Sequence, residues 1–207
     1  SNKQGATIHI ARQDSILGSL DATVVYDNKT YEVVDGMILL DKDSIQVVNG
    51  GPIYWDGATV HFDTIKMAGT QGSINIGGVI GGKPHESLWL TWQIGNAHIF
   101  NYFYRDPNLV LSGPLALQLE IPALQEGFDL RAFMQSPKFM VNGWNYGSLN
   151  LNTRWDGYRR DLFLNGYLKQ GKADARINGH YDAIKDDLDL TLSTNEFVIA
   201  PFQSYIQ

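Results

Sequence analysis

Apolar and polar residues alternate along most of this chain, the pattern of a β-strand with one buried face and one solvated face. Leu88, Leu90, Trp92 and Ile94 form one such stripe. Similar stripes follow one another at intervals of about 10 to 14 residues, the spacing of an antiparallel meander. No segment carries three turns of helical periodicity. The sequence therefore predicts an all-β protein.

Each half of the chain contributes a set of alternating apolar positions. On an alternating meander, all members of a set lie on one face of the sheet. We take the two sets as the candidate apolar wall. The set in the first half is Val60, Phe62, Ile74, Ile76, Leu88, Leu90, Trp92 and Ile94. The set in the second half is Leu149, Leu151, Leu162, Leu164, Ala173, Ala175, Ile177, Leu188, Leu190 and Leu192.

Short polar dipeptides that contain glycine separate or interrupt these stripes of alternating residues. Four of them are predicted to be turns or bulges because they favour positive φ angles. They are Asp156-Gly157, Asn165-Gly166, Gln170-Gly171 and Asn178-Gly179. Two further segments, 96–104 and 195–205, each begin with an asparagine that could cap a helix and then gather aromatic residues. We expect each to be an irregular or one-turn segment that closes a sheet.

The chain also repeats itself. Trp55-Asp56-Gly57 recurs 100 residues later (155 − 55 = 100) as Trp155-Asp156-Gly157. Gly72 matches Gly171, and Leu88–Trp92 matches Leu188–Leu192. Repeats in register are typical of stacked arrays. We predict two tandem β-units, residues 1–104 and 105–207, stacked as one continuous array.

The boundary between the predicted units falls at residues 105–108. There Asp106-Pro107-Asn108 breaks the chain, because proline cannot donate to a strand ladder and Asp and Asn favour turns. The apolar wall of the units must be covered in some way. A second sheet would cover it in a closed β-sandwich. Alternatively, the meander forms a curled sheet or β-groove (β-taco) whose inner wall stays apolar. The alternation of residues fits both arrangements.

Composition narrows the function classes. The 207 residues carry a net charge of −6, which argues against binding of nucleic acid phosphates. The chain has no cysteine, so it has no disulfide and no thiolate metal site. Ser1 and Asn2 resemble a cloning remnant. We therefore expect this chain to be a fragment whose membrane anchor lies outside it.

Motifs for catalysis or cofactor binding are not apparent, so we predict a non-enzymatic protein without cofactor or metal. The five histidines are scattered along the chain. Gly77-x4-Gly82-Lys83 resembles part of a phosphate loop, but Pro84 stands where Ser or Thr would hold magnesium. The aspartates from Asp182 to Asp189 miss the spacing of a calcium loop and are read as a solvated acidic turn.

Two features leave a binding alternative open. His61 and Asp63 share one strand face and could hold a metal, although the solvated face of a strand is the better explanation for them. Trp55 and Trp155 could stack on sugars, but their recurrence before Asp-Gly favours support of the same turn in each unit. The alternative function is therefore a secreted or surface β-sandwich module that binds a glycan or a protein.

The second half carries a series of short, strand-like sequence segments that contain or end near glycine. They include Gly143–Leu151, Leu164–Leu168, Ile177–Tyr181 and Leu188–Leu192, followed by the apolar and aromatic residues Phe197–Phe202. This series resembles the TamB branch of the AsmA-like superfamily, in its Bacteroidetes-type form, over about residues 20–207.

The resemblance implies a segment of a long periplasmic protein of the cell envelope, anchored in the inner membrane by a part that this chain lacks. It implies a role in outer membrane biogenesis, through phospholipid transport, outer-membrane protein assembly, or both. The implied partners are phospholipid or acyl chains in an apolar β-groove, and an outer-membrane barrel assembly protein that contacts other regions. Open sheet edges would also let the fragment self-associate.

Overall fold

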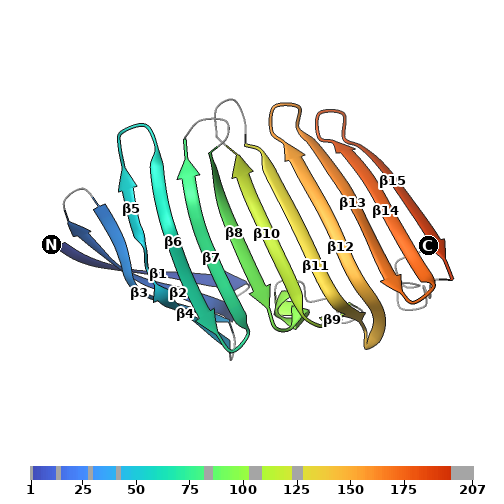
Figure 1. Cartoon of the computed structure of the whole chain (residues 1–207), viewed down its shortest axis with the longest axis horizontal. Helices are drawn as coiled ribbons and strands as arrows, with labels where there is room; N and C mark the ends of the chain where they lie inside the picture. Colours follow the sequence, from blue (N-terminus) through green and yellow to red (C-terminus); the bar gives the residue numbers. More distant parts are fainter. Residues whose placement is uncertain are drawn as a thin grey trace. The chain divides into compact units, whose positions relative to one another are not determined.

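The computed structural model describes residues 2–12, 15–27, 30–40, 43–81, 86–102, 109–122 and 128–196. Within these residues the chain forms fifteen strands and one short 3-10 helix, and its strands follow one another as an antiparallel meander (Figure 1). The prediction of an all-β protein is confirmed.

The chain divides into two compact units. The first unit consists of Ser1–Ile94 and Glu120–Gln125, and the second consists of Gly95–Leu119 and Glu126–Gln207. The boundary expected at Asp106-Pro107-Asn108 lies outside the described residues. Each unit is considered by itself below.

The first unit contains eight strands in the order β1-β2-β3-β4-β6-β7-β8, with β5 paired to β3 and β6. Their bounds are β1 (Asn2–Arg12), β2 (Ser15–Asp27), β3 (Thr30–Leu40), β4 (Asp43–Asn49), β5 (Pro52–Trp55), β6 (Val60–Gly69), β7 (Gly72–Ile80) and β8 (Ser87–Ile94).

The sheet of the first unit bends enough to bury its own apolar face. Its ladder is irregular on β2–β3, β4–β6 and β6–β7, and such bulges sharpen the local twist. In Figure 1, β1 and β2 run at a steep angle to β6 and β7. The resulting core centres on four side chains of β4, β6 and β7, and side chains from β3 to β8 pack around them. The four are Ile45, Ile65, Met67 and Ile74.

The second unit is a run of antiparallel neighbours, β11-β12-β13-β14-β15, joined by short turns. Strand β9 pairs with the end of β11. The bounds are η1 (Ala97–Tyr102), β9 (Leu111–Ser112), β10 (Leu115–Pro122), β11 (Leu130–Val141), β12 (Trp144–Asp156), β13 (Asp161–Gln170), β14 (Ala173–Asp182) and β15 (Asp187–Asn195). Of β10, only the part up to Leu119 belongs to this unit.

The first of the two expected closing segments is the 3-10 helix η1. Asn96 caps it, because its Oδ1 atom accepts hydrogen bonds from His98 N and Gly113 N, both at 3.1 Å. The side chains of Ala97 and Ile99 are fully buried. The expected short segment after Asn96 is therefore a 3-10 helix of six residues, about two turns instead of one. In the matching segment 195–205, Asn195 ends β15, and residues 197–205 lie outside the described residues.

Two of the four predicted turn words are wrong. Asp156-Gly157 and Gln170-Gly171 do enter turns, but Asn165-Gly166 and Asn178-Gly179 lie inside β13 and β14. The glycines serve side-chain packing instead of backbone reversal. A Cβ atom on Gly166 would lie 2.6 Å from Leu151 Cδ1, and one on Gly179 would lie 3.0 Å from Leu190 Cδ1. Leucines of neighbouring strands therefore lie across these glycines.

The repeated sequence Trp-Asp-Gly lies at a turn between two strands in both units. It precedes β6-β7-β8 in the first unit and β13-β14-β15 in the second. The Oδ1 atom of Asp56 accepts hydrogen bonds from Ala58 N at 2.9 Å and Thr59 N at 2.8 Å. The Oδ1 atom of Asp156 accepts one from Arg159 N at 2.9 Å. The repeat thus encodes a carboxylate that caps a turn.

Replacement of Asp56 by asparagine is expected to flatten the acid dependence of stability. The Thr59 and then the Ala58 backbone N–H groups hold the pKa of Asp56 well below its ordinary value of 3.8. A lowered folded-state pKa stabilises the protein above that ordinary value, and this contribution disappears as the pH falls. Between about pH 4 and pH 2, urea titrations should show a smaller loss for Asp56→Asn than for the unaltered chain. Parallel pH profiles would contradict this account.

Candidate functional site: the apolar sheet face

Cross-strand register places all ten predicted wall residues of the second unit on one face. Leu149 pairs with Leu168, Leu164 with Gly179, and Ile177 with Leu192. Because side chains alternate along each strand, these three pairs also determine the face on which the remaining predicted wall residues lie. Over β12 to β15 the face carries no charged side chain. Its members are Leu149, Leu151, Thr153, Trp155, Leu162, Leu164, Gly166, Leu168, Gln170, Ala173, Ala175, Ile177, Gly179, Tyr181, Leu188, Leu190, Leu192 and Thr194.

This apolar face becomes more exposed toward β15. Ala175 is buried, and the leucines of β12 and β13 are half-buried. The last three leucines are 64% (Leu188), 53% (Leu190) and 58% (Leu192) exposed. Single exposed apolar residues are ordinary, but a contiguous apolar patch marks a surface that binds something.

The eight predicted wall residues of the first unit also share one face. Val60 and Phe62 pair with Ile80 and Gly78, and Ile74 and Ile76 pair with Trp92 and Leu90. Here the face is largely a core, since Ile74 and Ile94 are buried and the others are half-buried. The two candidate walls therefore differ in how far their side chains are covered.

In each unit, the strands that the structure describes belong to one sheet. The curled-sheet alternative of the sequence analysis agrees with this arrangement. The closed-sandwich alternative does not, because no second sheet lies among the described residues of either unit taken by itself. The apolar side chains of these faces are therefore shielded from water either by the curvature of the sheet or by a bound molecule.

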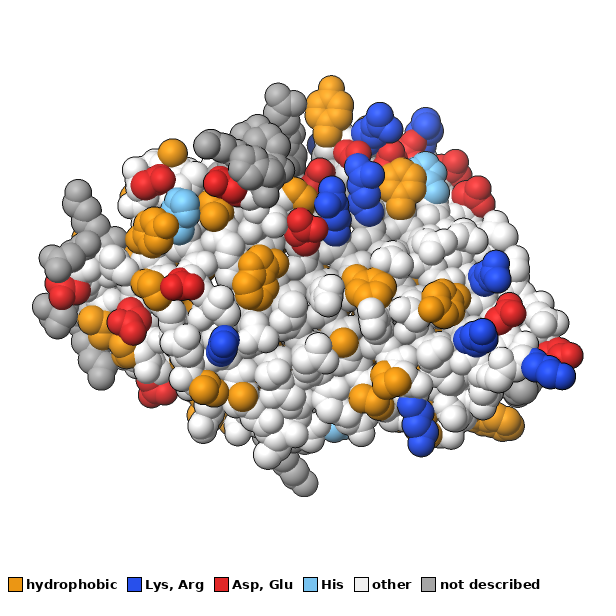
Figure 2. Space-filling model, in the orientation of Figure 1, with side chains coloured by type: hydrophobic (Ala, Val, Ile, Leu, Met, Phe, Trp, Pro, Cys, Tyr) orange, Lys and Arg blue, Asp and Glu red, His pale blue; other side chains and the backbone are white. Residues whose placement is uncertain are grey.

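The opposite face of the second unit is polar and has a regular pattern that the sequence analysis missed. Asn152, Asn165, Asn178 and Thr191 are paired in turn across β12 to β15. Asn165 donates a hydrogen bond through Nδ2 to Asn178 Oδ1. These four residues stand 13 apart (165 − 152 = 178 − 165 = 191 − 178 = 13), so a search for asparagine at a fixed interval would have found the first three of them. Figure 2 shows few charged side chains over the middle of this face.

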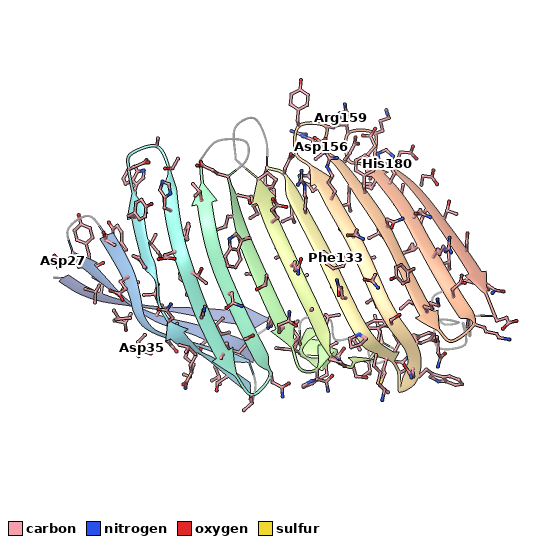
Figure 3. All side chains as sticks on the ribbon, in the orientation of Figure 1. Asp27, Asp35, Phe133, Asp156, Arg159 and His180 are labelled. Carbon is pink, nitrogen blue, oxygen red and sulfur yellow. The ribbon has the colours of Figure 1, made fainter. Side chains whose placement is uncertain are left out.

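Charged groups gather instead where the strands of the second unit turn. Asp156, Asp161, Asp182 and Asp187 pair in sequence across the four strands. Three of them have a basic neighbour: Arg154 lies 3.6 Å from Asp156, His180 lies 3.3 Å from Asp161, and Lys185 lies 2.7 Å from Asp182. Figure 3 shows Asp156, Arg159 and His180 together at this end.

Two carboxylates of this row, those of Asp156 and Asp182, accept hydrogen bonds within their turns as well as lying near a basic side chain. Asp182 Oδ1 accepts hydrogen bonds from Ile184 N at 2.9 Å and Lys185 N at 3.0 Å, and Lys185 lowers the pKa of Asp182. In the described part of the chain, no group of three or more histidine or acidic side chains is arranged to hold a metal ion. The predicted acidic turn matches this geometry.

The candidate metal pair and the tryptophans occupy different settings. His61 Nε2 lies 2.7 Å from Thr59 Oγ1, and its ring stacks on Tyr54 with centroids 4.5 Å apart. Asp63 instead accepts a hydrogen bond from Thr64 N at a bulge. The register shift between Phe62 and Ile65 interrupts the alternation of β6 around Asp63, and the carboxylate that lies near His61 is that of Asp56, with Oδ2 3.4 Å from Nε2. Trp55 is the last residue of β5, and Trp155 is the last but one residue of β12.

Taken together, the second unit offers an uncharged face that is partly open and backed by a polar face. Such a surface binds by removing apolar area from water and needs no specific hydrogen bond. Among the residues that the structure describes, no helix has the length and apolar character needed to cross a membrane.

Comparison of the chain with protein-family models, with characterised proteins and with solved structures finds no match in any of the three. The TamB-like resemblance therefore depends on the residues quoted for it and stays a prediction.

Proposed function

We propose that this chain is a non-enzymatic structural and lipid-conducting segment of a cell-envelope protein. It would lie in the periplasm, belong to a protein anchored in the inner membrane, and serve outer membrane biogenesis by moving phospholipid, by assisting outer-membrane protein assembly, or both. The resemblance to TamB-like proteins suggests this setting. The physical support comes from the apolar face.

One observation carries the proposal. The apolar face of the second unit continues across four strands without a charge, and its last three leucines are more than half exposed. An acyl chain gains about 0.8 kcal/mol per buried methylene, so a chain laid across the strands would be held without specific contacts. A uniform apolar surface would also let the lipid slide.

A charge on the apolar face should abolish lipid binding. Leu164→Asp places a carboxylate in the middle of this face, whereas Asn165→Asp places the same charge one residue away on the polar face. Native mass spectrometry of purified protein, followed by organic extraction, should find phospholipid or fatty acid with the unaltered chain and with Asn165→Asp, but not with Leu164→Asp. The β-sheet circular dichroism signal should be unchanged in all three.

Leu164 is half-buried, so Leu190→Asp provides a second variant at a position that tolerates charge because it is 53% exposed. Lipid loss in both variants with retained β-structure would support the proposal. A lipid-free mass for the unaltered chain, with no uptake when fatty acid is added, would reject it.

A second candidate is a surface module that binds glycans. The polar face of the second unit exposes the aromatic side chains of Phe163 and Tyr167, which flank Asn165 on β13. Aromatic faces and amides are groups that contact sugars through stacking and hydrogen bonding. If no lipid binds, glycan arrays with Tyr167→Ala as the comparison variant would test this function.

A further inference from the structure

We propose that β15 is a pairing edge for a second copy of this chain, which adds its own β15 in antiparallel orientation about a two-fold axis at Thr191. This inference concerns the strand edge and does not depend on lipid binding.

The first argument is the state of the edge. Strand β15 ends the strand order, and no described strand pairs with its outer side. All nine of its residues are exposed. Natural sheets protect such edges with proline, lysine or inward-pointing charges. Asp187–Asn195 contains no proline and no basic residue, and its three apolar side chains lie on the apolar face.

The second argument is the charge pattern, which selects the orientation and the register. Parallel pairing in register would set Asp187 and Asp189 against their own copies, and like charges directly opposite destabilise a sheet. Antiparallel pairing about Thr191 joins all nine residues, because 187 + 195 = 2 × 191. Asp187 then faces Asn195 of the second copy, and Asp189 faces Ser193. Both pairs join a carboxylate to a hydrogen-bond donor.

The third argument is continuity of both faces. In this register Leu190 faces Leu192 of the second copy, and Thr191 faces its own copy. A two-fold axis perpendicular to the sheet keeps the two apolar faces on the same side. The row of polar residues that ends at Thr191 likewise continues into the same row of the second copy, which begins at that copy's Thr191. The pairing therefore extends each face without a mismatch.

Two double variants at the same positions test the pairing. Leu190→Lys with Leu192→Lys sets lysine against lysine twice across the axis, whereas Leu190→Lys with Leu192→Asp sets lysine against aspartate twice. Both alter side chains that are more than half exposed, so the folded monomer should tolerate both. Ile184→Lys, an exposed apolar residue in the turn before β15, is the control.

Light scattering of lipid-free protein over a concentration series should give twice the 23.1-kDa chain mass for the unaltered chain, the Ile184→Lys control and the lysine–aspartate variant. The lysine–lysine variant should give a single chain mass. A monomeric unaltered chain would overturn the proposal, as would a lysine–lysine variant that still dimerises. Loss of the dimer in the lysine–aspartate variant would overturn the register.

Single cysteines provide an independent check, because the chain has none of its own. Residues directly opposite in antiparallel strands have Cα atoms about 4.5–5.5 Å apart, within the range of a disulfide. Thr191→Cys should form a cross-linked dimer on oxidation. Ser193→Cys should not, since its own copy lies four residues further along the strand, about 13 Å away. Cross-linking through Ser193→Cys in place of Thr191→Cys would overturn the register.

Discussion

Replacement of Ile45 by alanine is expected to lower the free energy of unfolding by about 2–5 kcal/mol, the cost of removing a large aliphatic side chain from a packed core. Ile45 is 2% exposed and lies against Ile65, Met67 and Ile74 in the core of the first unit. Urea denaturation followed by circular dichroism measures the change.

The matched variant is Leu190→Ala, which removes an aliphatic side chain from the apolar face of the second unit. Leu190 is 53% exposed, so the change in the free energy of unfolding should stay within about 0.5 kcal/mol. A cost for Leu190→Ala as large as that for Ile45→Ala would show that the second apolar face is covered. The proposed lipid surface would then be a core.

The sequence predicted which residues share a face, and it did so for a physical reason. Side chains alternate across a strand with a period of two, so a stripe such as Leu188, Leu190 and Leu192 determines its own face before any partner strand is known. The pairing of Ile177 with Leu192 and of Leu164 with Gly179 then follows from short turns.

The sequence did not predict how far each apolar face is covered. Coverage depends on the accumulated twist of the sheet, and bulges such as the one between Phe62 and Ile65 change that twist locally. A bulge leaves no clear mark in an alternating pattern. The two units look equivalent in sequence. This similarity did not reveal that the apolar face of the first unit is largely a core, whereas that of the second unit becomes exposed toward β15.

The two Asn-Gly words were misread for a related reason. Asn-Gly is the preferred word for a two-residue hairpin turn, and local preference alone favours a turn at Asn165-Gly166. In the structure the asparagine joins a polar row and the glycine leaves space for Leu151 on the other face. A contact between strands has therefore outweighed a local backbone preference, which is a common outcome in sheets.

Replacement of Gly72 by alanine is expected to destabilise the first unit strongly, by about 3 kcal/mol or more. Gly72 has a φ of +132°, which side chains of L residues rarely adopt, and a Cβ atom there would lie 1.7 Å from Gln93 O. This oxygen belongs to the backbone of β8, the strand that pairs with β7. The added methyl group would therefore push the two strands apart.

Gly171, the counterpart of Gly72 in the repeat, provides the control. Its φ is +63° and nothing lies within 4 Å of an added Cβ atom, so alanine should cost only the strain of a left-handed residue, about 1–2 kcal/mol. Urea denaturation of the two variants separates these effects, and hydrogen exchange should show loss of protection in β7 and β8 for Gly72→Ala alone. Equal costs would mean that the strands part easily at Gly72. Unequal costs would show that glycines aligned in the repeat meet different physical demands, as the two apolar faces do.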